Sequence, residues 1–147
     1  KNLVINKDLK KYDGLTFLNV KNEQINLDDY KGNLILLNFW ATWCSPCKKE
    51  MPSLDLLQAH KDFKNLKIFP INVGKDSNEK ASVFFKELKI NNLELYFDSP
   101  TTLAKNFQLR GIPTSILFNK EGLEFARIVG SIDFLDKRFV EWLNNYD

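Results

Sequence analysis

The chain has few of the side chains that bind metal ions. Its 147 residues include only two cysteines and one histidine, which are Cys44, Cys47 and His60. A structural zinc site normally needs four cysteine or histidine ligands, and at most three are available here. We therefore expect no metal site and no other cofactor.

A strong excess of one charge is also missing. The formal net charge at pH 7 is only +2, and basic and acidic residues are interspersed along the chain. Because there is no basic stripe, nucleic acid is not an expected partner.

Long apolar runs are absent too. No stretch approaches the length of a membrane span, and the first residues, Lys1–Lys7, have no signal-peptide pattern. Since the chain does not begin with methionine, we expect a processed or shortened form. Its length is near the usual size of a single core, which predicts one domain over residues 1–147, with residues 1–14 as an N-terminal extension.

The motifs of two enzyme classes are missing. His60 lies roughly four helical turns beyond Cys44, which is too far for it to act as the base of that cysteine. No serine belongs to a histidine and carboxylate arrangement that the sequence supports, so hydrolase chemistry is not expected. The chain also has no threonine-x-x-cysteine motif, which argues against a peroxidase.

Both cysteines belong to one C-x-x-C motif, Trp43–Cys47. Such a pair is a redox couple, half of a metal site or a structural crosslink. A crosslink stabilises most when it closes a long loop, and this ring would enclose only Ser45 and Pro46. The sequence therefore favours the redox couple.

The motif lies where a predicted strand becomes a predicted helix. Residues Leu34–Trp40 form a nearly continuous apolar run, as in a central parallel strand covered on both faces. After the motif, Met51, Leu54 and Leu57 recur about one turn apart, which predicts an amphipathic helix with its charged residues on the other side.

This position has a chemical consequence for the two sulfurs. The first N–H groups of a helix are unpaired and favour a thiolate, so Cys44 is the expected nucleophile. Cys47, one turn deeper, is the expected resolving cysteine. We expect Ser45 and Pro46 to tune the redox potential, since Pro46 suits a helix start and removes one N–H donor near the Cys44 sulfur.

Periodicity and turn signals predict the remaining elements. The further predicted strands are Leu15–Leu18, Gln24–Leu27, Leu66–Val73, Ser115–Asn119 and Leu123–Val129. Asp76–Glu79 has the spacing of a capping box before a helix, and Ser99-Pro100 resembles the start of a short helix. A terminal helix is predicted from the spacing of Leu135, Phe139, Trp142 and Tyr146.

The segment Phe39–Pro52 resembles the active-site segment of TlpA-like, membrane-anchored proteins in the thioredoxin superfamily. Gly111–Ser115 is similar to the cis-proline loop of that family, and Ile116–Gly122 is similar to its next strand and turn. The order of elements fits from about Leu15 to Trp142. The resemblance implies an α/β, thioredoxin-like fold, with a central mixed sheet flanked by helices, an N-terminal hairpin and a central insertion.

The resemblance also implies a substrate-binding surface. In the family, the proline that corresponds to Pro113 is cis and packs beside the cysteines, and the preceding residue, Ile112 here, offers its main-chain groups to an extended substrate. From the residues alone, Pro113 would be trans. Trp43 either forms an apolar platform for a partner near Cys44 or packs against the cis-proline loop.

The proton relay departs from the family pattern. Thioredoxins use a buried acid on the strand before the motif, and that position is Asn38 here. Several relatives carry a glutamate at the end of the next strand, where this chain has Lys75 with Asp76 beside it. As hypotheses, Lys75 stabilises the Cys44 thiolate and Asp76 accepts a proton from Cys47, while solvated loop charges are the alternative.

We therefore predict a protein-disulfide reductase that works by thiol-disulfide exchange. The same chemistry in the other direction, as an oxidant or isomerase, stays open, as does a non-catalytic binding module. The resemblance implies a membrane thiol-reducing protein as electron donor and copper chaperones or apocytochrome c as partners. Pro113–Ser115 differs from the proline-glutamate-threonine of the cytochrome c branch, which favours copper proteins. The resemblance also implies a location in the bacterial periplasm, with tethering by an N-terminal anchor absent from this chain. We expect a monomer.

Overall fold

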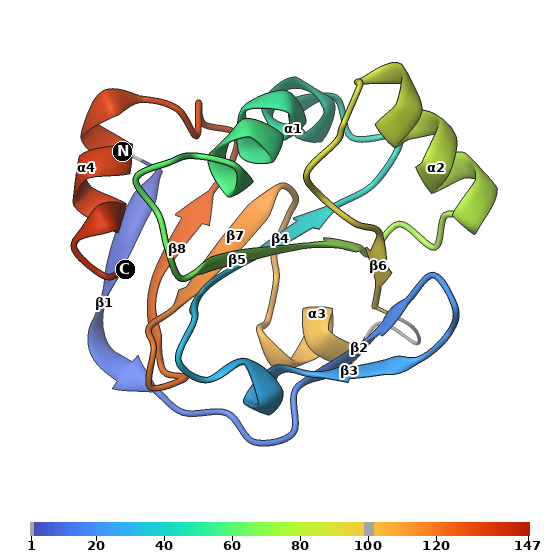
Figure 1. Ribbon diagram of the computed structural model, residues 1–147. Helices are drawn as coiled ribbons and strands as arrows, with labels where there is room; N and C mark the ends of the chain where they lie inside the picture. Colours follow the sequence, from blue (N-terminus) through green and yellow to red (C-terminus); the bar gives the residue numbers. More distant parts are fainter. Residues whose placement is uncertain (1, 99–101) are drawn as a thin grey trace.

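A computed structural model describes residues 2–98 and 102–147, and one eight-stranded mixed sheet forms the centre of the molecule (Figure 1). The strands follow one another in the sheet as β1-β8-β7-β4-β5-β6-β2-β3. Their bounds are β1 Leu3–Lys10, β2 Thr16–Asn19, β3 Gln24–Asn26, β4 Leu34–Trp40, β5 Leu66–Asn72, β6 Tyr96–Phe97, β7 Thr114–Phe118 and β8 Glu124–Val129. The helices are α1 Ser45–Gln58, α2 Asn78–Glu87, α3 Thr102–Asn106 and α4 Lys137–Asn144, with a short 3₁₀ helix at Leu27–Tyr30.

Strand β4 is the centre of this sheet, and each of its residues is buried. It runs parallel to β5 and antiparallel to β7, with Asn38 opposite Pro70 on one side and Ser115 on the other. The predicted central strand, its parallel neighbour and the two predicted hairpins are therefore confirmed.

The side chains of β4 alternate between two hydrophobic cores, as a strand requires. Leu36 and Trp40 face the core that α1, α2 and α4 cover, whereas Leu37 and Phe39 face the core beside α3. Figure 1 shows these helices on opposite faces of the sheet. Asn38 lies between Leu36 and Trp40 in this alternation, which places it on the α1 face.

Two strands have no counterpart among the predictions. Within the segment expected as an N-terminal extension, β1 pairs antiparallel with β8 at the edge of the sheet. Most of its side chains are exposed, so no clear inside-outside alternation marks it in the sequence. Strand β6 has only two residues, which is too short for periodicity to indicate.

The helices differ from the predictions in detail. The N-cap of α2 is Ser77, whose hydroxyl accepts from the Lys80 N–H, so the prediction that Asp76 opens a capping box is wrong. Leu135 lies before α4 and is 37% exposed, so it does not belong to the predicted face of this helix. Of the other predicted residues, Phe139 is buried and Trp142 and Tyr146 pack partly buried against the same core, which Val140 and Leu143 also join. The predicted Ser99-Pro100 helix start lies outside the described residues.

Within the described ranges, no helix is long and apolar enough to cross a bilayer.

Candidate active site

The two cysteines form a disulfide at the N-terminus of α1. Cys44 is the N-cap of this helix, and its Sγ accepts a hydrogen bond of 3.2 Å from the Cys47 N–H. Ser45 and Pro46 occupy the first two helical positions and are exposed. The predicted placement of the motif between strand and helix is therefore confirmed.

The two sulfurs differ in access. The exposed fraction is 5% for Cys44 and zero for Cys47. Cys44 also receives the N–H of the first helical turn, which stabilises negative charge on its sulfur once the disulfide is opened. Both differences favour Cys44 as the more reactive sulfur, and its role as nucleophile stays a prediction.

Trp43 is 69% exposed beside this disulfide. Its indole Nε1 lies next to Gly74 in the loop after β5, because a Cβ at Gly74 would be 3.0 Å from that atom and 2.5 Å from the Cβ of Ala41. The loop therefore passes close behind the active-site segment, and only glycine leaves it the room to do so.

The peptide bond between Ile112 and Pro113 is cis, in agreement with the resemblance. Pro113 is buried and Ile112 is half-buried. Strand β7 begins at the next residue, Thr114, which lies opposite Phe39 near the end of β4. The sheet register thus brings the predicted substrate-binding residues to the edge from which the C-x-x-C motif emerges.

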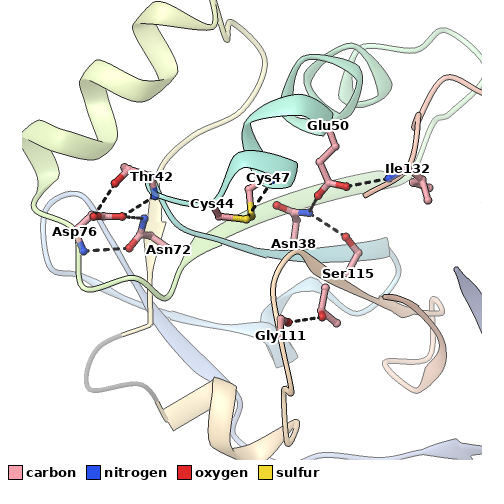
Figure 2. The surroundings of a disulfide bond; sticks show 11 residues. Asn38, Thr42, Cys44, Cys47, Glu50, Asn72, Asp76, Gly111, Ser115 and Ile132 are labelled. Atoms are coloured by element: carbon pink, nitrogen blue, oxygen red, sulfur yellow. Dashed lines mark hydrogen bonds between the residues drawn. A yellow bond between two sulfur atoms is a disulfide. The ribbon is translucent and has the colours of Figure 1, made fainter. Parts of the chain in front are cut away.

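A buried polar network lies behind the disulfide (Figure 2). The Asn38 Nδ2 group donates to Glu50 Oε2 over 2.8 Å and to Ser115 Oγ over 3.0 Å. The Ile132 N–H donates to Glu50 Oε1 over 3.3 Å. Glu50 is 2% exposed, and burial raises its pKa to about 7 even though these hydrogen bonds oppose the shift.

Glu50 is the site residue that the sequence-based analysis missed. The prediction that the charged residues of α1 face away from the core is wrong for Glu50 and Asp55, which are both buried. Glu50 follows Cys47 by three positions, so it shares the inward face of α1 with that cysteine. This spacing was the available signal, and the amphipathic pattern of the neighbouring lysines concealed it.

Asp76 has a different environment from the one expected of a relay. Its carboxylate accepts from the Thr42 N–H over 2.9 Å, from Thr42 Oγ1 over 2.8 Å and from Asn72 Nδ2 over 2.9 Å. Burial raises the pKa of Asp76, but these hydrogen bonds outweigh it and the net shift is downward. Lys75 is exposed. The relay roles of both residues stay predictions, and the contacts of Asp76 favour a role in holding the loop.

Comparison with known proteins places these observations in a family. The model of the AhpC/TSA family matches residues 6–123, which is most of the chain. The chain belongs to the AhpC/TSA family. It is similar to the thiol-disulfide oxidoreductase ResA of Bacillus subtilis (strain 168), with 32% identity over 110 residues. That match covers 75% of this chain and 60% of ResA, so the chain spans less than two thirds of this relative.

Solved structures agree with the family. This AhpC/TSA chain resembles StoA from Bacillus subtilis with a TM-score of 0.70 and 25% identity, over 90% of this chain and 94% of StoA. It resembles a secreted thiol-disulfide isomerase from Corynebacterium glutamicum with a TM-score of 0.80 and 22% identity, over 99% and 93% of the two chains. The predicted thioredoxin-like fold is confirmed, as is the predicted relation to thiol-disulfide oxidoreductases.

Proposed function

We propose that this AhpC/TSA-family chain is a thiol-disulfide oxidoreductase that reduces disulfides of partner proteins. The observation that carries the proposal is the Cys44–Cys47 disulfide at the start of α1, in which Cys44 is the N-cap and accepts the Cys47 N–H. The similarity to ResA supports the same chemistry.

The reaction begins from the dithiol form. The Cys44 thiolate attacks one sulfur of a partner disulfide, that S–S bond breaks, and the other partner sulfur leaves as a thiolate that takes a proton from water. Cys47 then loses its proton and attacks the Cys44 sulfur of the mixed disulfide. The Cys44–Cys47 bond forms, the second partner sulfur leaves as a thiolate, and two electrons have passed to the partner.

Glu50 is the base that this second step requires. Its position one turn after Cys47, its burial and a pKa of about 7 allow it to take the Cys47 proton near neutral pH, while the departing partner thiolate takes a proton from water. A carboxyl group with an ordinary pKa would hold that proton too weakly.

Partner binding is assigned to the surface around Cys44. The exposed Trp43 offers an apolar platform, and Ile112 and Pro113 lie at the same edge of the sheet. We propose partners with disulfides or cysteine pairs, among them copper chaperones and apocytochrome c, and a membrane thiol-reducing protein as electron donor. We also propose that the protein works as a monomer in the bacterial periplasm, tethered by an N-terminal anchor.

Insulin reduction with dithiothreitol tests the activity. The parent should accelerate the reduction, and Cys47→Ser should abolish turnover while retaining a mixed disulfide with the partner. Equal rates with and without the parent would refute an exchange activity and leave a binding module. The trapped mixed disulfide of Cys47→Ser, isolated from cells, identifies the partners.

A redox titration against glutathione tests the direction of the reaction. Proteins with this motif span about −270 to −120 mV, and a reductase belongs near the lower end. A value near the upper end would reverse the assignment to that of an oxidant or isomerase.

A further inference from the structure

The buried network behind the disulfide contains one acceptor without a donor. Asn38 is completely buried, and both hydrogens of its Nδ2 group are used, by Glu50 and by Ser115. Its Oδ1 atom is also buried and finds no hydrogen-bond donor in the described part of the chain. An unpaired buried carbonyl carries the cost of its lost hydration, so such atoms are rare in native proteins and call for an explanation.

The orientation of this oxygen suggests which state uses it. Asn38 lies on the face of β4 that meets α1, and the side chains of Cys47 and Glu50 point inward from one face of that helix. Figure 2 shows the amide nitrogen of Asn38 directed toward Glu50 and Ser115, and its oxygen directed toward the disulfide. In the disulfide form, neither sulfur carries a hydrogen that it can donate.

We propose that Asn38 Oδ1 accepts a hydrogen bond from the Cys47 thiol when the pair is in its dithiol form. Asn38 is then a positioning residue that holds the Cys47 thiol through its oxygen and the Glu50 carboxylate through its nitrogen. This inference rests on the proposed exchange function, because only reduction of the Cys44–Cys47 bond supplies the S–H donor.

The hydrogen bond affects the redox equilibrium. Reduction of the disulfide takes up two electrons and one proton, which leaves Cys44 as the thiolate and gives Cys47 its S–H. Since the bond to Asn38 exists only afterwards, it stabilises the dithiol form, while the unpaired oxygen destabilises the disulfide form. Asn38 therefore makes the protein easier to reduce than an apolar residue at this position would.

Asn38→Leu tests this consequence, because leucine has a similar size and no polar atoms. The equilibrium constant with glutathione should move about tenfold toward the disulfide, which is about 30 mV for a two-electron couple. Ser115→Ala is the matched control, since it removes another contact of Asn38 but leaves Oδ1 in place, and it should change the constant less than twofold. An unchanged constant in Asn38→Leu, or a shift toward the dithiol, would overturn the proposal.

The loss of the Nδ2 contacts needs a separate control. The same Asn38→Leu change should be measured in a Glu50→Gln background, where no carboxylate titrates at this position. If the tenfold shift persists there, it comes from Oδ1. If it disappears, the effect belongs to Glu50 and the proposal fails.

A spectroscopic test leaves Asn38 unchanged. In the parent, the ¹³Cγ signal of Asn38 should shift on reduction of the disulfide. Cys47→Ser retains an O–H donor and Cys47→Ala has none, so the Ser variant should resemble the reduced parent and the Ala variant should not. Identical signals in the two variants would contradict the hydrogen bond. Because this readout requires no turnover, it is independent of whether insulin reduction, and with it the proposed function, succeeds.

Discussion

The fold moves the pKa of Glu50 to near neutral pH, where the proposed exchange reaction needs a base. This pKa rises from 4.5 to about 7 because burial penalises the charged form more than the hydrogen bonds from Asn38 and Ile132 favour it. Between these two pH values, the folded protein holds a proton that the unfolded chain has released. Stability should therefore fall as pH rises from about 4.5 to about 7, by about 3 kcal/mol in total.

Glu50→Gln should remove this dependence. We expect the variant to match the parent near pH 4 and to be more stable at pH 8 by up to about 3 kcal/mol. Urea unfolding of the disulfide forms at pH 4, 6 and 8 measures this, since the bonded cysteines do not titrate. A parent whose stability is flat from pH 4.5 to pH 8 would show that Glu50 is not perturbed.

The same residue should control the rate of exchange. If Glu50 is the base for Cys47, the kcat/KM of insulin reduction should rise with pH through a midpoint near 7, as the carboxylate forms. Glu50→Gln should lack this rise and be slower by about 10²-fold at pH 8. A pH profile identical in parent and variant would assign the proton to another group.

At the scale of elements, the loop between β5 and α2 supports the active-site segment. A Cβ at Gly74 would come within 2.5 Å of Ala41 Cβ and 3.0 Å of the Trp43 indole nitrogen. Gly74→Ala should therefore cost about 1–3 kcal/mol, measured by urea unfolding, and should alter the Trp43 emission. Gly111→Ala is the control, because a Cβ there would meet no atom within 4 Å. Equal stabilities of the two variants would contradict the close approach.

In addition to its backbone pairing with β8, strand β1 contacts a buried charge. Glu124 is completely buried and lies 2.8 Å from the Arg127 Nε, and its carboxylate also accepts from Asn6 Nδ2 and the Tyr12 hydroxyl. Removing one partner of a buried ion pair is costly, at about 3–5 kcal/mol. Glu124→Ala should therefore destabilise the protein by an amount of this order.

The loss of stability in Glu124→Ala should be confined to the edge of the sheet where β1 lies. Amide exchange in Leu3–Lys10 should accelerate more in Glu124→Ala than exchange in Leu34–Trp40, because only the first segment depends on these contacts. Uniform acceleration would mean that Glu124 supports the whole sheet rather than the attachment of β1.

At the scale of the whole molecule, the fold should not depend on the disulfide. The two hydrophobic cores lie on opposite faces of the sheet, whereas the ring between Cys44 and Cys47 encloses only two residues. Reduction should therefore change the free energy of unfolding by about 2 kcal/mol or less, with a cooperative transition in both forms. Urea unfolding with and without dithiothreitol measures this, and loss of the transition on reduction would contradict it.

The strong patterns of the sequence predicted the centre of this molecule. Strand β4, its parallel neighbour β5 and the C-x-x-C motif at the start of α1 follow from long apolar runs and from capping chemistry. The edge strand β1 was not predicted, because most of its side chains are exposed and its sequence has no clear alternation of apolar and polar residues. Glu50 was missed for a different reason, since the partners that bury it come from β4 and from Ile132, which only the tertiary structure brings together.

Strand β4 is buried along its whole length, and the redox pair follows it after three residues. Cys44 is thus joined by a short segment to the most completely buried strand of the sheet. Because Cys44 is only 5% exposed, the proposed exchange requires the disulfide of a partner to adjust its position so that its sulfur can approach Cys44 in line. The protein should select clients by their own local disorder, and prefer unfolded or loosely tethered chains to compact ones.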